Sequence, residues 1–86
     1  MPIVSAFFGI IITMYWREHG RPHFHAKYGE HGATFDIETL DILTGSLPHR
    51  ARLMVLEWAF EHREELMRNW RLCQEYSTPN PITPLE

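Results

Sequence analysis

The 86-residue sequence has a single cysteine, Cys73, so no disulfide can form within the chain. A lone cysteine favours a reducing compartment and is most simply a core thiol. The sequence also lacks an excess of positive charge, because 8 Lys and Arg are set against 11 Asp and Glu for a formal net charge of −3. Proteins that bind nucleic acids over a broad surface usually carry a net basic field, so any contact with RNA has to be local.

Long apolar runs are also missing. The largely apolar stretch of residues 2–14 is too short to span a bilayer, and it has neither the charged start nor the cleavage site of a secretory signal. We therefore expect a cytoplasmic protein that makes no membrane contact. Only 5 Gly and 6 Pro occur, and 44% of the residues are apolar, a composition that predicts a folded globular protein.

The first half of the chain carries the alternating pattern of β-strands. We expect a lead-in or edge strand in residues 1–8, a well-buried strand in 9–16, further strands in 23–28 and 33–38, and a short fourth strand in 42–44. Gly29 and Gly32 mark a tight turn between two of these strands. Ala33, Phe35 and Ile37 are expected to point inward.

The second half predicts one long helix from Pro48 to about Gln74, because no Gly or Pro occurs between these two residues. One apolar side is expected to cover the sheet and comprises Ala51, Val55, Trp58, Ala59, His62, Leu66, Trp70 and Cys73. A second, narrower apolar stripe comprises Leu53, Leu56, Phe60 and Met67. We interpret this stripe as an interface for a partner or for a second copy of the chain in a homodimer, with residues 1–8 folding back onto it as the alternative.

These elements predict an α+β fold: a three- to four-stranded antiparallel sheet followed by one long C-terminal helix packed on one face. Residues 1–76 are expected to form a single domain. Residues 77–86 contain Pro79, Pro81 and Pro84, and they predict a tail that is extended or disordered unless it is docked.

The stretch Pro22–Tyr28 is the strongest candidate for a functional site. On an extended strand Phe24 and Ala26 face the core, while His23, His25 and Lys27 share the other side. Two imidazoles on one side of a strand could act as general base and general acid on a phosphodiester, because histidine titrates near neutral pH.

A metal-independent ribonuclease without cofactors is thus one hypothesis, with His23, His25 and Lys27 as catalytic residues. Lys27 or Arg21 would stabilise negative charge on the phosphoryl group, and Tyr15 and Asp36 would complete the substrate-binding positions. The carboxylates of Asp36 and Glu38 would orient the imidazoles, but they would also repel phosphate.

Two other interpretations of the histidines stay open. The first is a metal site made by His23 and His25, with His19 or Asp36 as a further ligand. No metal is favoured, because a lone His-x-His pair is a weak signal. The second is structural: the imidazoles bond across strands, each pair contributing about 0.2 to 1 kcal/mol, and the protein works as a non-enzymatic binding module.

Several separated motifs resemble a bacterial family called domain of unknown function 4160. The residues that carry the resemblance are Gly9, Met14 and Tyr15, the run HGRPHFHAKYG from His19 to Gly29, Phe35-Asp36-Ile37, Gly45, Leu47-Pro48, Glu57-Trp58, His62-Arg63, Glu65-Leu66 and Asn69-Trp70. The resemblance spans roughly residues 9 to 71. Arg21 departs from the family pattern, which has a proline pair before the histidines.

The resemblance implies a biological setting more than a mechanism. Members are often encoded beside a small protein of the family called domain of unknown function 2442, in pairs that look like toxin and antitoxin modules. The present chain would be the toxin, the small partner the antitoxin, and RNA the target by analogy with other toxins of this size.

Overall fold

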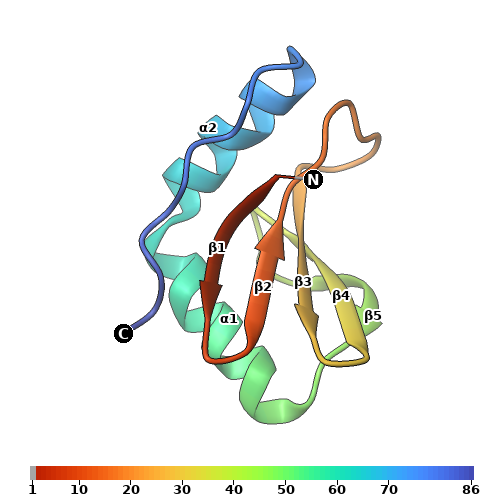
Figure 1. Cartoon of the computed structure of the whole chain (residues 1–86). Coiled ribbons are helices and arrows are strands. Elements are labelled where there is room, and N and C mark those ends of the chain that lie inside the picture. Colours follow the sequence, from red (N-terminus) through yellow and green to blue (C-terminus); the bar gives the residue numbers. More distant parts are fainter. Residues whose placement is uncertain (1) are drawn as a thin grey trace.

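The computed structural model describes residues 2–86 and shows an antiparallel sheet with two helices packed against it (Figure 1). The strands are β1 (Ile3–Phe7), β2 (Ile10–Thr13), β3 (His23–Tyr28), β4 (His31–Asp36) and β5 (Ile42–Ser46), and the helices are α1 (His49–Glu61) and α2 (Arg63–Gln74). The five strands lie in the sheet in chain order, so each strand pairs with the next. The expected α+β class with an antiparallel sheet is confirmed.

The expected number of three to four strands is too low, because residues 3–7 form a full edge strand. β1 pairs with β2 across a two-residue turn in which Phe8 and Gly9 have φ angles of 49° and 82°. Two consecutive positive φ angles match the right-handed twist of paired strands, so this turn favours a hairpin. The neighbouring strand is shorter than expected and ends at Thr13, and Trp16 is half exposed rather than buried.

The core lies between the sheet and the helices. Phe24 and Phe35 stack in the middle of the sheet with ring centroids 5.3 Å apart, and Trp58 of α1 packs edge-on against Phe24 at 5.8 Å. The inward direction predicted for Ala33, Phe35 and Ile37 is confirmed by their burial. On the helical side the buried apolar residues are Ala51, Val55, Trp58, Ala59, Leu66 and Cys73, while His62 and Trp70 are half buried.

The single long helix predicted for the second half is wrong at His62, where φ is −121° and ψ is 24°. The His62 amide donates to the Ala59 carbonyl at 3.1 Å, which tightens the last turn of α1. Its imidazole Nδ1 lies 2.7 Å from Glu65 Oε1 in the first turn of α2 and its ring packs on Trp58. The His62 side chain therefore connects the two helices across the break. The break contains no glycine or proline that would mark it in the sequence.

Residues 77–86 return along both helices toward β1, as the blue segment of Figure 1 shows. Asn69 of α2 binds the backbone of Asn80 through both its amide oxygen and its amide nitrogen, each at 2.8 Å. The Trp58 indole donates to the Thr83 carbonyl at 2.8 Å, and the Ile82 amide donates to the Val4 carbonyl at 2.7 Å. The proline-rich tail is therefore docked. No helix within residues 2–86 is long and apolar enough to cross a membrane.

Candidate functional site

The extended segment predicted around the two histidines is present as β3. Phe24 and Ala26 are buried in the core, whereas His23, His25 and the exposed Lys27 lie on the opposite side of the strand. The two imidazole rings are neighbours, with centroids 5.3 Å apart. The period of two along a strand therefore brings these rings together as expected.

The two imidazoles converge on the carboxylate of Glu18, a residue outside the predicted site. His25 Nε2 lies 2.8 Å and 3.0 Å from the two carboxylate oxygens of Glu18, and His23 Nε2 lies 3.3 Å from Glu18 Oε1. We call these three residues, Glu18, His23 and His25, the histidine cluster. Glu18 belongs to the polar connection between β2 and β3, and no spacing rule marks it as a partner of the two histidines.

Contacts with the end of α2 hold Glu18 in place. The Gln74 side-chain amide donates to the Glu18 carbonyl at 3.1 Å, and the Arg17 amide donates to the Cys73 carbonyl at 3.2 Å. Cys73 is fully buried, as expected for a core thiol. Burial raises the pKa of its thiol, and the nearby charge of Glu18 raises the pKa further. The thiol therefore stays protonated and is a poor nucleophile.

A backbone carbonyl fixes the orientation of the His23 ring. His23 Nδ1 lies 2.7 Å from the Arg21 carbonyl oxygen, which can only accept a hydrogen bond, so Nδ1 carries a proton. Trp70 of α2 packs against the ring with centroids 5.1 Å apart, and the His23 side chain is only 11% exposed. The other nitrogen, Nε2, is thereby directed at Glu18.

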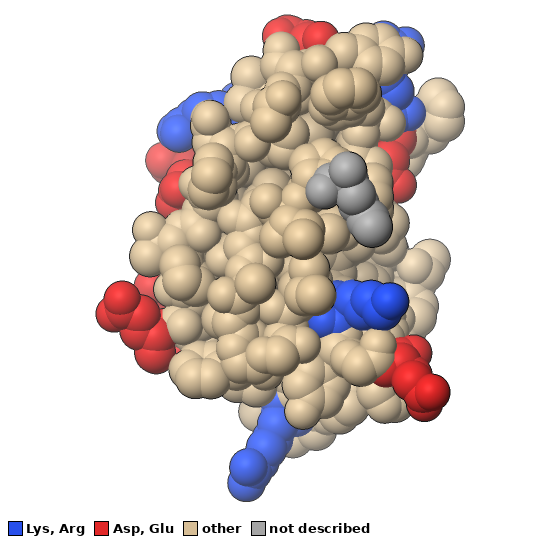
Figure 2. All heavy atoms as spheres, in the orientation of Figure 1, with Lys and Arg blue, Asp and Glu red and all other residues tan. Residues whose placement is uncertain are grey.

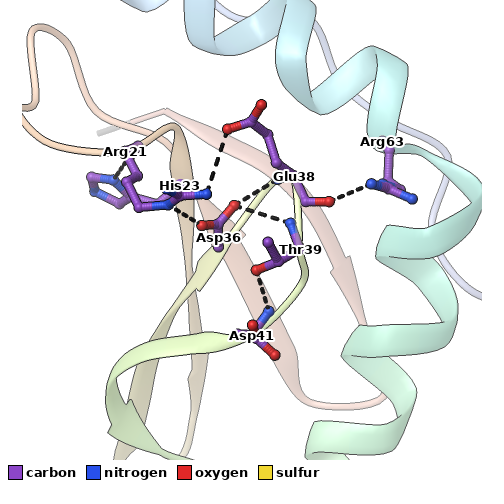
Figure 3. A network of polar contacts seen from close by, with 7 residues as sticks. All are labelled: Arg21, His23, Asp36, Glu38, Thr39, Asp41 and Arg63. Atoms are coloured by element: carbon purple, nitrogen blue, oxygen red, sulfur yellow. Dashed lines mark hydrogen bonds and ion pairs between the residues drawn. The ribbon is translucent and has the colours of Figure 1, made fainter.

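The predicted substrate-binding residues Arg21 and Asp36 bind each other rather than lying free (Figure 3). The Asp36 side chain is buried and also accepts hydrogen bonds from the amides of Glu38 at 2.7 Å and Thr39 at 3.1 Å. Burial alone would raise the pKa of Asp36, but the bond from Arg21 and the two amides outweigh it and hold the pKa below its usual value. In turn, the hydrogen bond and charge of Asp36 raise the pKa of Arg21. In this arrangement Asp36 shapes the turn after β4.

The remaining predicted site residues differ in how close they lie to the histidine cluster. The Tyr15 ring meets the His25 ring edge-on with centroids 4.8 Å apart, and its hydroxyl accepts a hydrogen bond from Thr13. Tyr15, His25 and Lys27 line a hollow of about 580 Å³ on the open face of the sheet. His19, the third expected metal ligand, is exposed and lies outside the group of residues 18, 23 and 25 whose ligand atoms converge.

The predicted partner interface divides into two pairs. Leu53 and Phe60 are exposed, with 47% and 69% of their surfaces accessible, whereas Leu56 and Met67 are partly buried against the core. Residues 3–7, the alternative cover for this stripe, instead form the edge strand that pairs with β2, and Leu53 and Phe60 stay exposed. The outer surface of α1 therefore carries two large apolar side chains that this chain leaves in contact with solvent.

A family model described as "Domain of unknown function (DUF4160)" matches residues 9–71. The match includes every member of the histidine cluster and both helices except the last turn of α2. No curated protein and no solved structure matches the chain.

Proposed function

The chain belongs to the family described as Domain of unknown function (DUF4160), and from this premise we propose that it is the toxin of a bacterial toxin and antitoxin pair and acts on RNA at the histidine cluster. The main support for this site is that two imidazoles and one carboxylate converge, with one ligand atom of each lying within 4.8 Å of the others. Cleavage of a phosphodiester needs groups that activate an attacking oxygen, and such a cluster can supply them.

The cluster as a whole, rather than the two histidines alone, is the proposed reacting centre. Both Nε2 atoms face the same Glu18 carboxylate, so they do not flank an empty space that would fit a phosphate between base and acid. His25 is the more accessible of the two rings, with 30% of its side chain exposed. Lys27 is exposed about 7 Å further along the same strand face, where it can neutralise charge on the substrate.

Exposed aromatic side chains just before Glu18 in the sequence and just after α2 support a single-stranded RNA substrate. Trp16 and Tyr76 are 50% and 60% exposed, and their rings meet edge-on with centroids 5.8 Å apart. The Arg17 guanidinium lies 5.3 Å from the centre of the Tyr76 ring. Exposed aromatic rings beside an arginine are suited to stacking with unpaired bases.

Charge limits the RNA contact to this small area. In the face shown in Figure 2 residues other than Lys, Arg, Asp and Glu cover most of the centre, and the basic and acidic side chains lie mainly around the outline. The net charge of −3 adds no general attraction to phosphate. The proposed substrate is therefore a short single-stranded segment and not a long duplex.

An RNA degradation assay tests the proposal. The purified chain is expected to cleave single-stranded RNA, and Glu18→Gln or His25→Ala is expected to reduce the rate by about 100-fold or more, because each change removes a group at the reacting centre. His49→Ala is the matched control, since His49 is an exposed histidine in the first turn of α1. Absence of cleavage by the wild type, or equal losses in the control, would contradict the proposal.

For the antitoxin, we propose a small protein of the domain of unknown function 2442 family that covers Leu53 and Phe60 on α1. These two apolar side chains are exposed on one helix, and burial of such a pair is favourable. A second copy of the chain is the alternative occupant. An interface with either partner is also compatible with a toxin that acts by binding its target rather than by catalysis.

Co-purification with the small protein encoded beside the chain tests this interface. Phe60→Asp is expected to abolish capture, because a charge placed in an apolar contact is costly to bury. Phe8→Asp is the matched control: Phe8 is 60% exposed but lies in the turn between β1 and β2. Capture that survives Phe60→Asp, or that is lost equally in both variants, would place the interface elsewhere. Dimerisation of the isolated chain would identify the second copy as the occupant.

A further inference from the structure

The histidine cluster has the spacing of a metal site. His23 Nε2, His25 Nε2 and a carboxylate oxygen of Glu18 all lie within 4.8 Å of one another, and Glu18 Oε1 is 3.3 Å and 2.8 Å from the two nitrogens. Ligand atoms around a tetrahedral ion bound at about 2.0 to 2.2 Å are about 3.4 Å apart. Side-chain shifts on the order of 1 Å would therefore bring the three atoms to ligand positions.

The His23 tautomer gives a second reason to expect a cation. Because Nδ1 donates its hydrogen to the Arg21 carbonyl, the neutral ring has a lone pair on Nε2, and this lone pair faces Glu18 Oε1. Two acceptors opposed in this way repel each other unless a proton or a cation lies between them. A histidine that donates one ring nitrogen to a carbonyl and offers the other to an ion is the usual arrangement in protein metal sites.

The surroundings of the cluster favour a positive ion. Imidazoles bind metal ions in their neutral form, so two imidazole ligands and one carboxylate ligand together carry a charge of −1. The Arg21 guanidinium is bound to Asp36 and Glu38 instead of to the cluster (Figure 3). The His23 ring is held by Trp70, and the Glu18 backbone is held by Gln74. The ligands are thus oriented before an ion arrives, which lowers the cost of binding.

We infer that Glu18, His23 and His25 form a binding site for one divalent transition-metal ion of the zinc class. Imidazole nitrogens with a carboxylate suit such ions better than they suit Mg²⁺ or Ca²⁺, which prefer oxygen ligands. Without an ion, His25 Nε2 carries the hydrogen that it donates to the Glu18 carboxylate. When the ion binds, Nε2 gives up this hydrogen to solvent and Nδ1 takes one up, so the neutral ring offers Nε2 as a ligand and metal bonds replace the hydrogen bond to Glu18.

The site has an open side. Glu18 and His25 expose 26% and 30% of their side chains, and three protein ligands leave coordination positions for water or for a substrate oxygen. This is the ligand number of catalytic rather than structural zinc sites. The inference does not depend on the RNA proposal, since metal binding is measured without RNA and stands if cleavage is absent.

A calorimetric titration of the metal-free full chain with Zn²⁺ alone tests the inference. The wild type is expected to bind about one ion per chain, and Glu18→Gln, His23→Ala and His25→Ala are each expected to weaken binding by about 10-fold or more. Titration with Co²⁺ reports the same site by visible absorption. His31→Ala and His49→Ala remove exposed histidines outside the cluster and are expected to bind like the wild type.

Thermal unfolding separates loss of the site from loss of the fold. Zn²⁺ is expected to raise the melting temperature of the wild type and of the two control variants but not that of Glu18→Gln, whose side chain is partly exposed and is not needed by the core. Failure of the wild type to saturate with Zn²⁺ overturns the inference. Undiminished binding by Glu18→Gln overturns it as well, and so does a loss in His19→Ala as large as that in His25→Ala.

Discussion

Replacing Trp58 with alanine is expected to lower the free energy of unfolding by about 3 to 5 kcal/mol, the range for removing a large aromatic side chain from a core. Trp58 is 1% exposed and contacts both layers and the tail: its ring lies 5.4 Å from Phe7 of β1 and 5.8 Å from Phe24 of β3, and its indole binds the Thr83 carbonyl. Small domains have total stabilities of about 5 to 15 kcal/mol, so a large part of the margin would be lost. Chemical denaturation of both proteins measures the difference.

Two further variants show which part of Trp58 matters. Trp58→Phe keeps most of the ring but removes the bond to Thr83, so it is expected to cost less than Trp58→Ala. Trp16→Ala is the control for loss of a tryptophan, because Trp16 is half exposed in the connection after β2. If Trp16→Ala destabilised the chain as much as Trp58→Ala, the central position of Trp58 in the core would be refuted.

The apolar pattern was a good guide to which residues are buried. Alternation in residues 33–37 and the helical spacing of Ala51, Val55, Trp58 and Ala59 both predict the observed core, because burial of apolar area drives each element against the next. The pattern was a poorer guide to where elements end. At His62 the chain leaves the helical conformation without a glycine or proline, and the contacts that His62 makes there with Trp58 and Glu65 form only once the chain has folded.

The candidate site was predictable only in part, for the same reason. The shared direction of His23 and His25 follows from strand geometry alone. The pairing of His23 with Asp36 follows from the register between β3 and β4, which places Asp36 beside Arg21 as well. The position of Glu18 depends on the connection after β2 and its contacts with α2, far away in sequence. Local periodicity contains no information about that contact.

The proposals for metal and for RNA become linked if both experiments succeed. A bound ion would occupy the Nε2 atoms of both histidines, and these atoms could then no longer exchange protons with RNA. In that case cleavage should require Zn²⁺ or a related ion. Cleavage that is unaffected by removal of metal would assign the histidines to acid and base roles, and it would separate this chemistry from the ion.

Replacing Asp36 with alanine is expected to cost about 1.5 to 3 kcal/mol at neutral pH, the range for hydrogen bonds to a charged group, because it removes the buried carboxylate that accepts from the amides of Glu38 and Thr39 and binds Arg21. The folded-state pKa of Asp36 is lowered, so its charge stabilises the fold above about pH 4 and this contribution is lost as the pH falls below that value. The difference in unfolding free energy between wild type and Asp36→Ala should therefore shrink in acid. Asp36→Asn, which keeps an oxygen for the amides, should cost less at neutral pH. A difference that grows as the pH is lowered would show that the Asp36 carboxylate does not stabilise this turn through its charge.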